Sequence, residues 1–320
     1  MQIIRHGYLL LLISVLVITV LVSLSFGSQY ISISELWNGH SIQHQEIIYG
    51  IRVPRIINAI TVGALLSMAG LMIQNLVKNP LADPYILGLS GASASVQLAI
   101  IASGIVLPFW LFMLLGFVAA IASLLLLLLL SSRKRINTSN LLLSGVVIAF
   151  AYGAIISLLL TLSPMATTKP MLFWLMGDLS YTLPSQIPMV LLALGMIWAY
   201  RYHRELDLLA RGEFFAEKCG VNVIRINLIL LVTTSVFTAI AVSMAGTIGF
   251  IGLVVPHIAR MLVGNKHAQL IPLSALLGAI ILLIADTVAR TIVAPIQLPV
   301  GIFTALFGVP VFLILLRKKT

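Results

Sequence analysis

"GTIGFIGLVVPHIARMLVG", residues Gly246–Gly264, is an apolar stretch that glycines, one proline, one histidine and one arginine interrupt. Glycine and proline both disfavour a long unbroken helix. The stretch closes a run of 34 uncharged residues, 226–259, that lies between Arg225 and Arg260. The path of the chain through this run decides how often the protein crosses a membrane.

The composition of the whole chain indicates a membrane protein. The chain has 320 residues, of which 60% are hydrophobic and 9% are charged, and its mean hydropathy is +1.13. A soluble domain carries about 25% charged residues. We therefore expect one all-α transmembrane domain over residues 1–320, surrounded by lipid.

The uncharged segments predict ten transmembrane helices, because a crossing needs about 20 apolar residues. The first segment is longer than a signal-peptide core and no clear cleavage site follows it, so we interpret it as a retained helix. The predicted helices lie within 7–34, 56–77, 84–132 (two, separated at Gly104 and Pro108), 140–163, 183–200, 226–259 (two), 269–285 and 300–316.

The basic residues orient these helices, since cytoplasmic loops are enriched in Lys and Arg. With ten crossings, most of them fall on one side, including the run 133–135 and the tail 317–319, and both termini are then cytoplasmic. Only Arg52, Arg55, Lys169 and Arg290 fall on the other side. The net charge of +10 is spread in short clusters between apolar runs, which is typical of membrane topology and not of nucleic-acid binding.

The run 226–259 must leave and return to the same side, yet as a helix it is only about 50 Å long, against about 60 Å for two crossings. One limb is therefore short. Gly246, Gly249 and Gly252 mark a turn or close packing near a pathway, and Pro256 can end or kink the returning limb. Ordinary small-residue helix packing is the alternative. His257 fits a structural hydrogen bond better than a ligand.

No catalytic or nucleotide-binding motif is present in the sequence. GxxxxGK[ST], HExxH, CxxC and GxSxG are all absent, so we expect no enzyme activity and no cofactor in this chain. Asp286 is the one acid deep in an apolar segment, and Arg290 at i+4 can pair with it. The energy for transport is therefore expected to come from a partner.

The cytoplasmic loop 201–227 is a candidate docking surface. Its residues Glu213–Lys218 favour a short helix that Gly220 ends, and Phe214 and Phe215 give this helix apolar side chains. Such a helix fits the groove of another protein. A solvated connector is the alternative.

Along nearly its whole length the chain resembles the FecCD-type permease subunits of ABC importers for ferric siderophores, heme and vitamin B12. The matching stretches keep the family's order and spacing. They are RVPRIINAITVGALLSMAGLMIQNLVKNPLADPYILGLSGAS (52–93), NTSNLLLSGV (137–146), MLFWLMGDLS (171–180), FFAEKCGVNVIR (214–225), the opening stretch, ADTVART (285–291) and LPVGIFTALFGVPVFLILL (298–316).

The resemblance implies a bacterial cytoplasmic-membrane subunit that pairs with a second permease, identical or related. Two ATPase subunits, which bind ATP and Mg²⁺, and an extracytoplasmic substrate-binding protein complete the importer. Ferric siderophore is the expected cargo, with heme or vitamin B12 as alternatives. A secondary transporter is disfavoured because deep coupling charges are scarce.

The resemblance also implies roles for individual residues. Contacts to lipid headgroups or helix ends are the alternative for the arginines, and helix capping is the alternative for Thr138 and Ser139. The implied sites are binding-protein docking at Arg52, Arg55 and Arg290; a cytoplasmic gate at Asn79, Leu81, Thr138 and Ser139; ATPase coupling at Glu213, Phe214, Phe215, Ala216, Gly220 and Arg225; and a pathway and reversal segment at Gly246, Gly249, Gly252, Pro256 and His257.

Overall fold

The computed structural model describes residues 2–27, 29–32, 42–131, 138–180 and 186–317, and within these ranges it is all-helical. The basic run 133–135, Asn137 and the last residues of the basic tail lie outside the described residues. The helices are α1 (Gln2–Ser25), α3 (Ile42–Gln45), π-helical η1 (Glu46–Arg52), α4 (Val53–Val77), 3₁₀-helical η2 (Pro84–Leu87), α5 (Leu89–Ser103), α6 (Phe109–Ser131), α7 (Thr138–Leu162), α8 (Met165–Leu175), α9 (Gln186–Arg201), α10 (His203–Leu209), α11 (Glu213–Lys218), α12 (Val223–Ala245), α13 (Ile251–Val263), α14 (His267–Thr291) and α15 (Val300–Arg317).

Each of the ten predicted spans folds as a helix, but the helices differ in length. Six are long and apolar enough to cross a membrane, namely α1, η1 with α4, α6, α7, α12 and α14. The other four, α5, α9, α13 and α15, have apolar cores of 10–17 residues. The protein is therefore an integral membrane protein, and the number of ten crossings stays a prediction.

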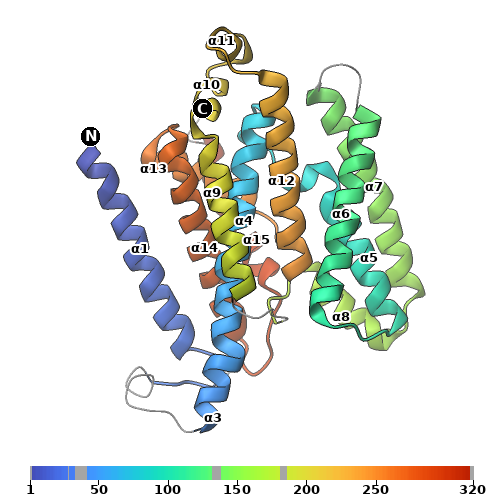
Figure 1. The fold of residues 1–320 in the computed structure, drawn as a ribbon. Coiled ribbons are helices and arrows are strands. Elements are labelled where there is room, and N and C mark those ends of the chain that lie inside the picture. Colours follow the sequence, from blue (N-terminus) through green and yellow to red (C-terminus); the bar gives the residue numbers. More distant parts are fainter. Residues whose placement is uncertain (1, 28, 33–41, 132–137, 181–185, 318–320) are drawn as a thin grey trace.

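α4 is the central helix of the bundle and packs against α12, α13 and α14 (Figure 1). In its most apolar window 89% of the residues are buried, against 11% in α1 and in α7. Glycines permit the close contacts, because a Cβ on Gly63 would lie 2.3 Å from the Gly278 carbonyl oxygen of α14. α1 lies at one side of the bundle, and α5, α6, α7 and α8 form a group at the other (Figure 1).

Both described chain ends lie at the same end of the bundle as α10 and α11 (Figure 1). We call this the terminal end, and we call the end that bears α3 the opposite end. That this end is cytoplasmic, as the sequence predicts for the two termini and the loop 201–227, stays a prediction.

The reversal after α12 has the expected short limb. α12 has 23 residues, the chain turns through 246–250, and α13 returns with only 13 residues. Pro256 does not end the returning helix, which continues to Val263. The break predicted at Gly104 is confirmed, because this glycine caps α5 with a φ of 70°. The sequence did not predict α8, in which Pro170 lies inside the helix.

Candidate functional site: the two ends of the helix bundle

An ion-pair cluster at the opposite end contains two of the three arginines predicted to dock a binding protein. Asp286 on α14 is fully buried and binds Arg55 of α4, with 2.9 Å between Nη2 and Oδ1. Arg290 binds the other carboxylate oxygen, with 3.0 Å between Nε and Oδ2, so the predicted i, i+4 pair is confirmed. Arg55 also donates from Nη1 to Ser180 Oγ at 3.1 Å and to Gln297 Oε1 at 2.8 Å.

The third arginine, Arg52, caps the C-terminal end of α1. Its guanidinium donates to the carbonyl oxygens of Leu24 and Ser25 in the last turn of α1, which have no donor within the helix, and to the carbonyl oxygen of Gln29 beyond it. Arg290 reaches the same helix, where Nη2 donates to Ser23 Oγ at 2.7 Å.

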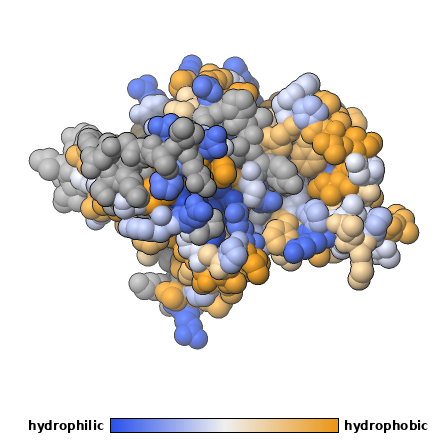
Figure 2. All heavy atoms as spheres, turned by 90° about the horizontal axis from the view of Figure 1, so that it is seen from below, coloured by the Kyte–Doolittle hydropathy of each residue, from blue (hydrophilic) through white to orange (hydrophobic). Residues whose placement is uncertain are grey.

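The three arginines are only 3–5% exposed, which the sequence did not predict. Contact with a helix end, the alternative to docking, is present at Arg52. Docking of a binding protein stays a prediction. Figure 2 views the opposite end, where a hydrophilic patch lies near the centre and hydrophobic side chains lie to its right.

The predicted short helix in the loop 201–227 is confirmed as α11, Glu213–Lys218. Phe214 is 72% exposed and Phe215 is 41% exposed, whereas Ala216 is buried and anchors the helix. Gly220 follows the helix with a φ of 82°, as its capping role requires.

One exposed ion pair links α11 to the end of α4. Lys78, just after α4, binds Glu213 with 2.8 Å between Nζ and Oε1. Lys218 lies over the Phe214 ring at 4.7 Å from its centroid, and the exposed Arg225 lies in the first turn of α12. α11 therefore presents apolar and basic groups together at the terminal end.

The glycines of the reversal segment do not share one role. A Cβ on Gly246, whose φ is 70°, would lie 2.0 Å from the Trp174 carbonyl oxygen. A Cβ on Gly252 would lie 2.8 Å from Pro84 Cδ. Gly249 lies in the turn and has open space around its Cβ position, so of the two expected roles, a turn or close packing, only the turn applies to it.

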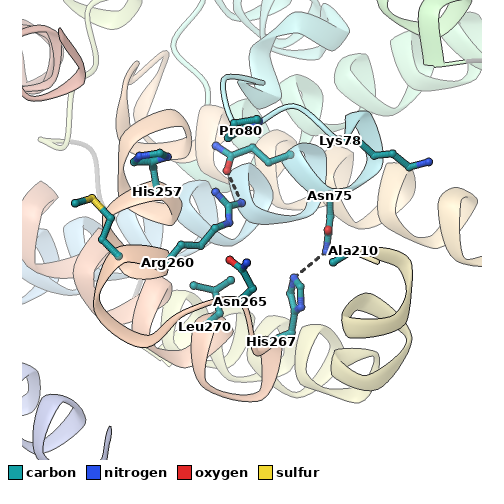
Figure 3. A pocket seen from close by; sticks show the side chains of 11 residues that line it. Asn75, Lys78, Pro80, Ala210, His257, Arg260, Asn265, His267 and Leu270 are labelled. Atoms are coloured by element: carbon teal, nitrogen blue, oxygen red, sulfur yellow. Dashed lines mark hydrogen bonds between the residues drawn. The ribbon is translucent and has the colours of Figure 1, made fainter. Parts of the chain in front are cut away.

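Pro256 leaves one carbonyl oxygen of α13 without its helical hydrogen bond. Since proline has no N–H, the Gly252 carbonyl loses its helical donor. Gln74 of α4 donates to that oxygen at 3.3 Å and to the Leu253 oxygen at 3.1 Å. The Gln74 oxygen accepts from Arg260 Nη2 at 2.6 Å, so one buried amide joins α4 to α13 (Figure 3). The sequence reasoning missed Gln74.

The predicted gate residues lie in the turn after α4 and at the start of α7. Asn79 accepts from the Leu81 N–H at 2.9 Å in the turn after α4, and the Leu81 side chain is 42% exposed. Thr138 and Ser139 begin α7, and Ser139 is exposed. A Cβ on Gly145 of α7 would lie 2.5 Å from the Ile86 carbonyl oxygen of η2. The side chain of Thr138 lies outside the described residues, and the gating role stays a prediction.

Asp83 and Tyr85, in the segment after that turn, are further polar groups that the sequence reasoning did not single out. Burial raises the pKa of Asp83 to about 6, although its carboxylate accepts from the Tyr85 N–H at 2.8 Å, which opposes the shift. The Tyr85 hydroxyl donates to the Ile248 carbonyl at 3.0 Å and thereby holds the reversal segment.

A cavity of 510 Å³ opens at the terminal end between α4, α10, α13 and α14 (Figure 3). It is lined by Gln74, Asn75, Lys78, Pro80, Ala210, His257, Arg260, Met261, Asn265, His267 and Leu270. His267 lies between Asp207, at 2.7 Å from Nδ1, and Asn75, at 2.8 Å from Nε2. Burial alone would raise the pKa of Asp207, but the hydrogen bonds from His267 outweigh it and lower that pKa.

The model of the FecCD transport family matches residues 15–318. The chain belongs to the FecCD transport family. It is 40% identical to the cobalamin import permease BtuC of Halobacterium salinarum, over 86% of this chain and 74% of that protein. It is 38% identical to the hemin permease HmuU of Yersinia pestis, over 98% and 95% of the two chains. It is 37% identical to the Fe(3+)-citrate permease YfmE of Bacillus subtilis, over 97% and 94%.

A solved structure extends this likeness to the fold. It is an ABC transporter assigned to the metal-chelate type in an inward-facing conformation, and it is 30% identical with a TM-score of 0.86. The match covers 98% of this chain and 99% of that one. The protein is therefore the permease of a type II ABC importer, and its named relatives are transport components.

Proposed function

We propose that this chain carries ferric siderophore across a bacterial cytoplasmic membrane as one permease domain. Two ATPase subunits with bound ATP and Mg²⁺ drive it, a second permease subunit completes the pathway, and a substrate-binding protein delivers the cargo. The match of nearly the whole chain to the FecCD transport family supports this importer complex. The names of the hemin and Fe(3+)-citrate relatives support an iron chelate as cargo.

The proposal that α11 couples the permease to the ATPase rests on the exposure of Phe214 and Phe215. Large apolar side chains that remain exposed beside charged groups mark a contact with a protein or a membrane. We therefore assign the terminal end to the cytoplasm and α11 to the ATPase contact. The alternative cargo under the same mechanism is heme or cobalamin, and cobalamin is the cargo in the name of the BtuC relative.

Uptake by cells that lack this gene, compared with cells in which it is restored, tests the cargo. Iron-55 is supplied on a panel of siderophores, with labelled heme and labelled cobalamin in parallel. We expect one ferric siderophore to regain uptake with the gene. Rescue of heme or cobalamin uptake alone would keep the importer and refute the siderophore.

A further inference from the structure

The cavity at the terminal end has an unbalanced charge. Its lining includes Lys78, His257, Arg260 and His267, and no Asp or Glu among the described residues. Lys78 already binds Glu213 at 2.8 Å, and its side chain extends away from the hollow (Figure 3). His267 already binds Asp207 at 2.7 Å. Arg260 is thus the lining cation whose charge no described carboxylate neutralises.

Arg260 has only a neutral partner. Its Nη2 donates to the Gln74 amide oxygen, and its Nη1 is shielded from solvent and has no hydrogen-bond partner among the described residues. A guanidinium that is mostly withdrawn from water and lacks a counter-charge is costly. An anion in the cavity would offset that cost, and the amide groups of Asn265 and Asn75 lie around the same hollow (Figure 3).

The surroundings of the cavity indicate where such an anion comes from. Met261, which lines the cavity, is 57% exposed, and Leu262 beside it is 38% exposed. α13 therefore places an exposed apolar surface next to a basic hollow at the end of a membrane helix. A phospholipid has the matching arrangement, because its anionic phosphate is joined to apolar acyl chains. Basic pockets between membrane helices bind such headgroups.

We propose that this cavity binds a phosphate group, supplied by the headgroup of an anionic phospholipid. Arg260 provides the charge, Asn265 provides a neutral donor, and the exposed apolar side chains of α13 contact the acyl chains. The site is separate from cargo transport, so a failure of the siderophore proposal leaves it standing.

The test measures lipid binding to the purified full chain in detergent by native mass spectrometry. The probes are dioleoylphosphatidylglycerol, dioleoylphosphatidylcholine and inorganic phosphate. We expect phosphatidylglycerol to bind about tenfold more weakly to Arg260→Gln, as for the loss of one charge-assisted hydrogen bond. Asn265→Asp, a change at an exposed residue that folding tolerates, should weaken binding in the same way because it adds a repelling carboxylate.

Lys218→Gln is the matched control, since it removes one positive charge from the same end but does not line the cavity. It should bind phosphatidylglycerol as the wild type does. Equal binding by all variants, or equal loss in the control, would overturn the site. Displacement of the lipid by dilute inorganic phosphate would assign the site to free phosphate and overturn the lipid. Loss of a co-purifying ATPase from Arg260→Gln, with lipid binding unchanged, would assign the cavity to a protein partner.

Discussion

Gly70 of α4 lies directly against the backbone of α13. A Cβ built on Gly70 lies 1.8 Å from the Gly252 carbonyl oxygen and 2.6 Å from the Gly252 Cα. A carbon and an oxygen that are not bonded approach to about 3.3 Å. Gly70→Ala therefore forces the two helices apart by about 1.5 Å. Both obstacles are backbone atoms, so no side-chain rotation relieves the clash.

Overpacking of this kind costs about 1–3 kcal/mol, and we expect the upper end of that range here. The displacement also draws Gln74 away from the two α13 carbonyls that it satisfies. The assay is the unfolding temperature of the purified protein in detergent, together with uptake in cells. We expect a lower unfolding temperature and loss of uptake.

Gly249→Ala is the matched control for stability, because Gly249 lies in the turn before α13 and its Cβ position has open space. This variant should unfold at the same temperature as the wild type. The packing argument is refuted if Gly70→Ala is as stable as the wild type, or if Gly249→Ala is equally damaging.

Three further variants test other parts of the account. Asp286→Asn leaves Arg55 and Arg290 buried without their acid and should cost about 3–5 kcal/mol of unfolding free energy, which an unchanged denaturation midpoint would contradict. Asp83 has a folded pKa of about 6, above its ordinary 3.8, so its protonated form stabilises the fold at low pH and that contribution is lost as pH rises through 4–6. Asp83→Asn keeps the acceptor for the Tyr85 N–H and should therefore raise stability above pH 6 by up to about 3 kcal/mol and not below pH 4; a gain independent of pH would be inconsistent with burial of the charge. Phe214→Ala with Phe215→Ala should reduce ATPase binding at least tenfold without lowering the unfolding temperature, because both rings are exposed; unchanged ATPase binding would argue against α11 as the contact.

The sequence predicted those features of the fold that depend on charge and chain length. The short returning limb follows from 34 uncharged residues between two arginines, and the structure has a helix of 13 residues there. α11 follows from a charged, helix-prone segment before Gly220. These features are local, so the residues that determine them are close together in the chain.

The rest depended on contacts between distant segments. Gln74 meets α13 across 178 positions, and Arg55 meets Asp286 across 231. Neither a periodicity nor a motif within one segment encodes such a pair. The burial of the arginines, the open space at Gly249 and the charge imbalance of the cavity required the three-dimensional arrangement for the same reason.

The central claim is that this permease imports a metal chelate at the expense of ATP hydrolysed by a partner. Its most direct test is uptake of iron-55 siderophore into proteoliposomes that contain this chain, its second permease subunit and its ATPase, with the binding protein outside. We predict uptake only when ATP and Mg²⁺ are enclosed on the side of α11. Equal uptake without enclosed ATP would contradict the account.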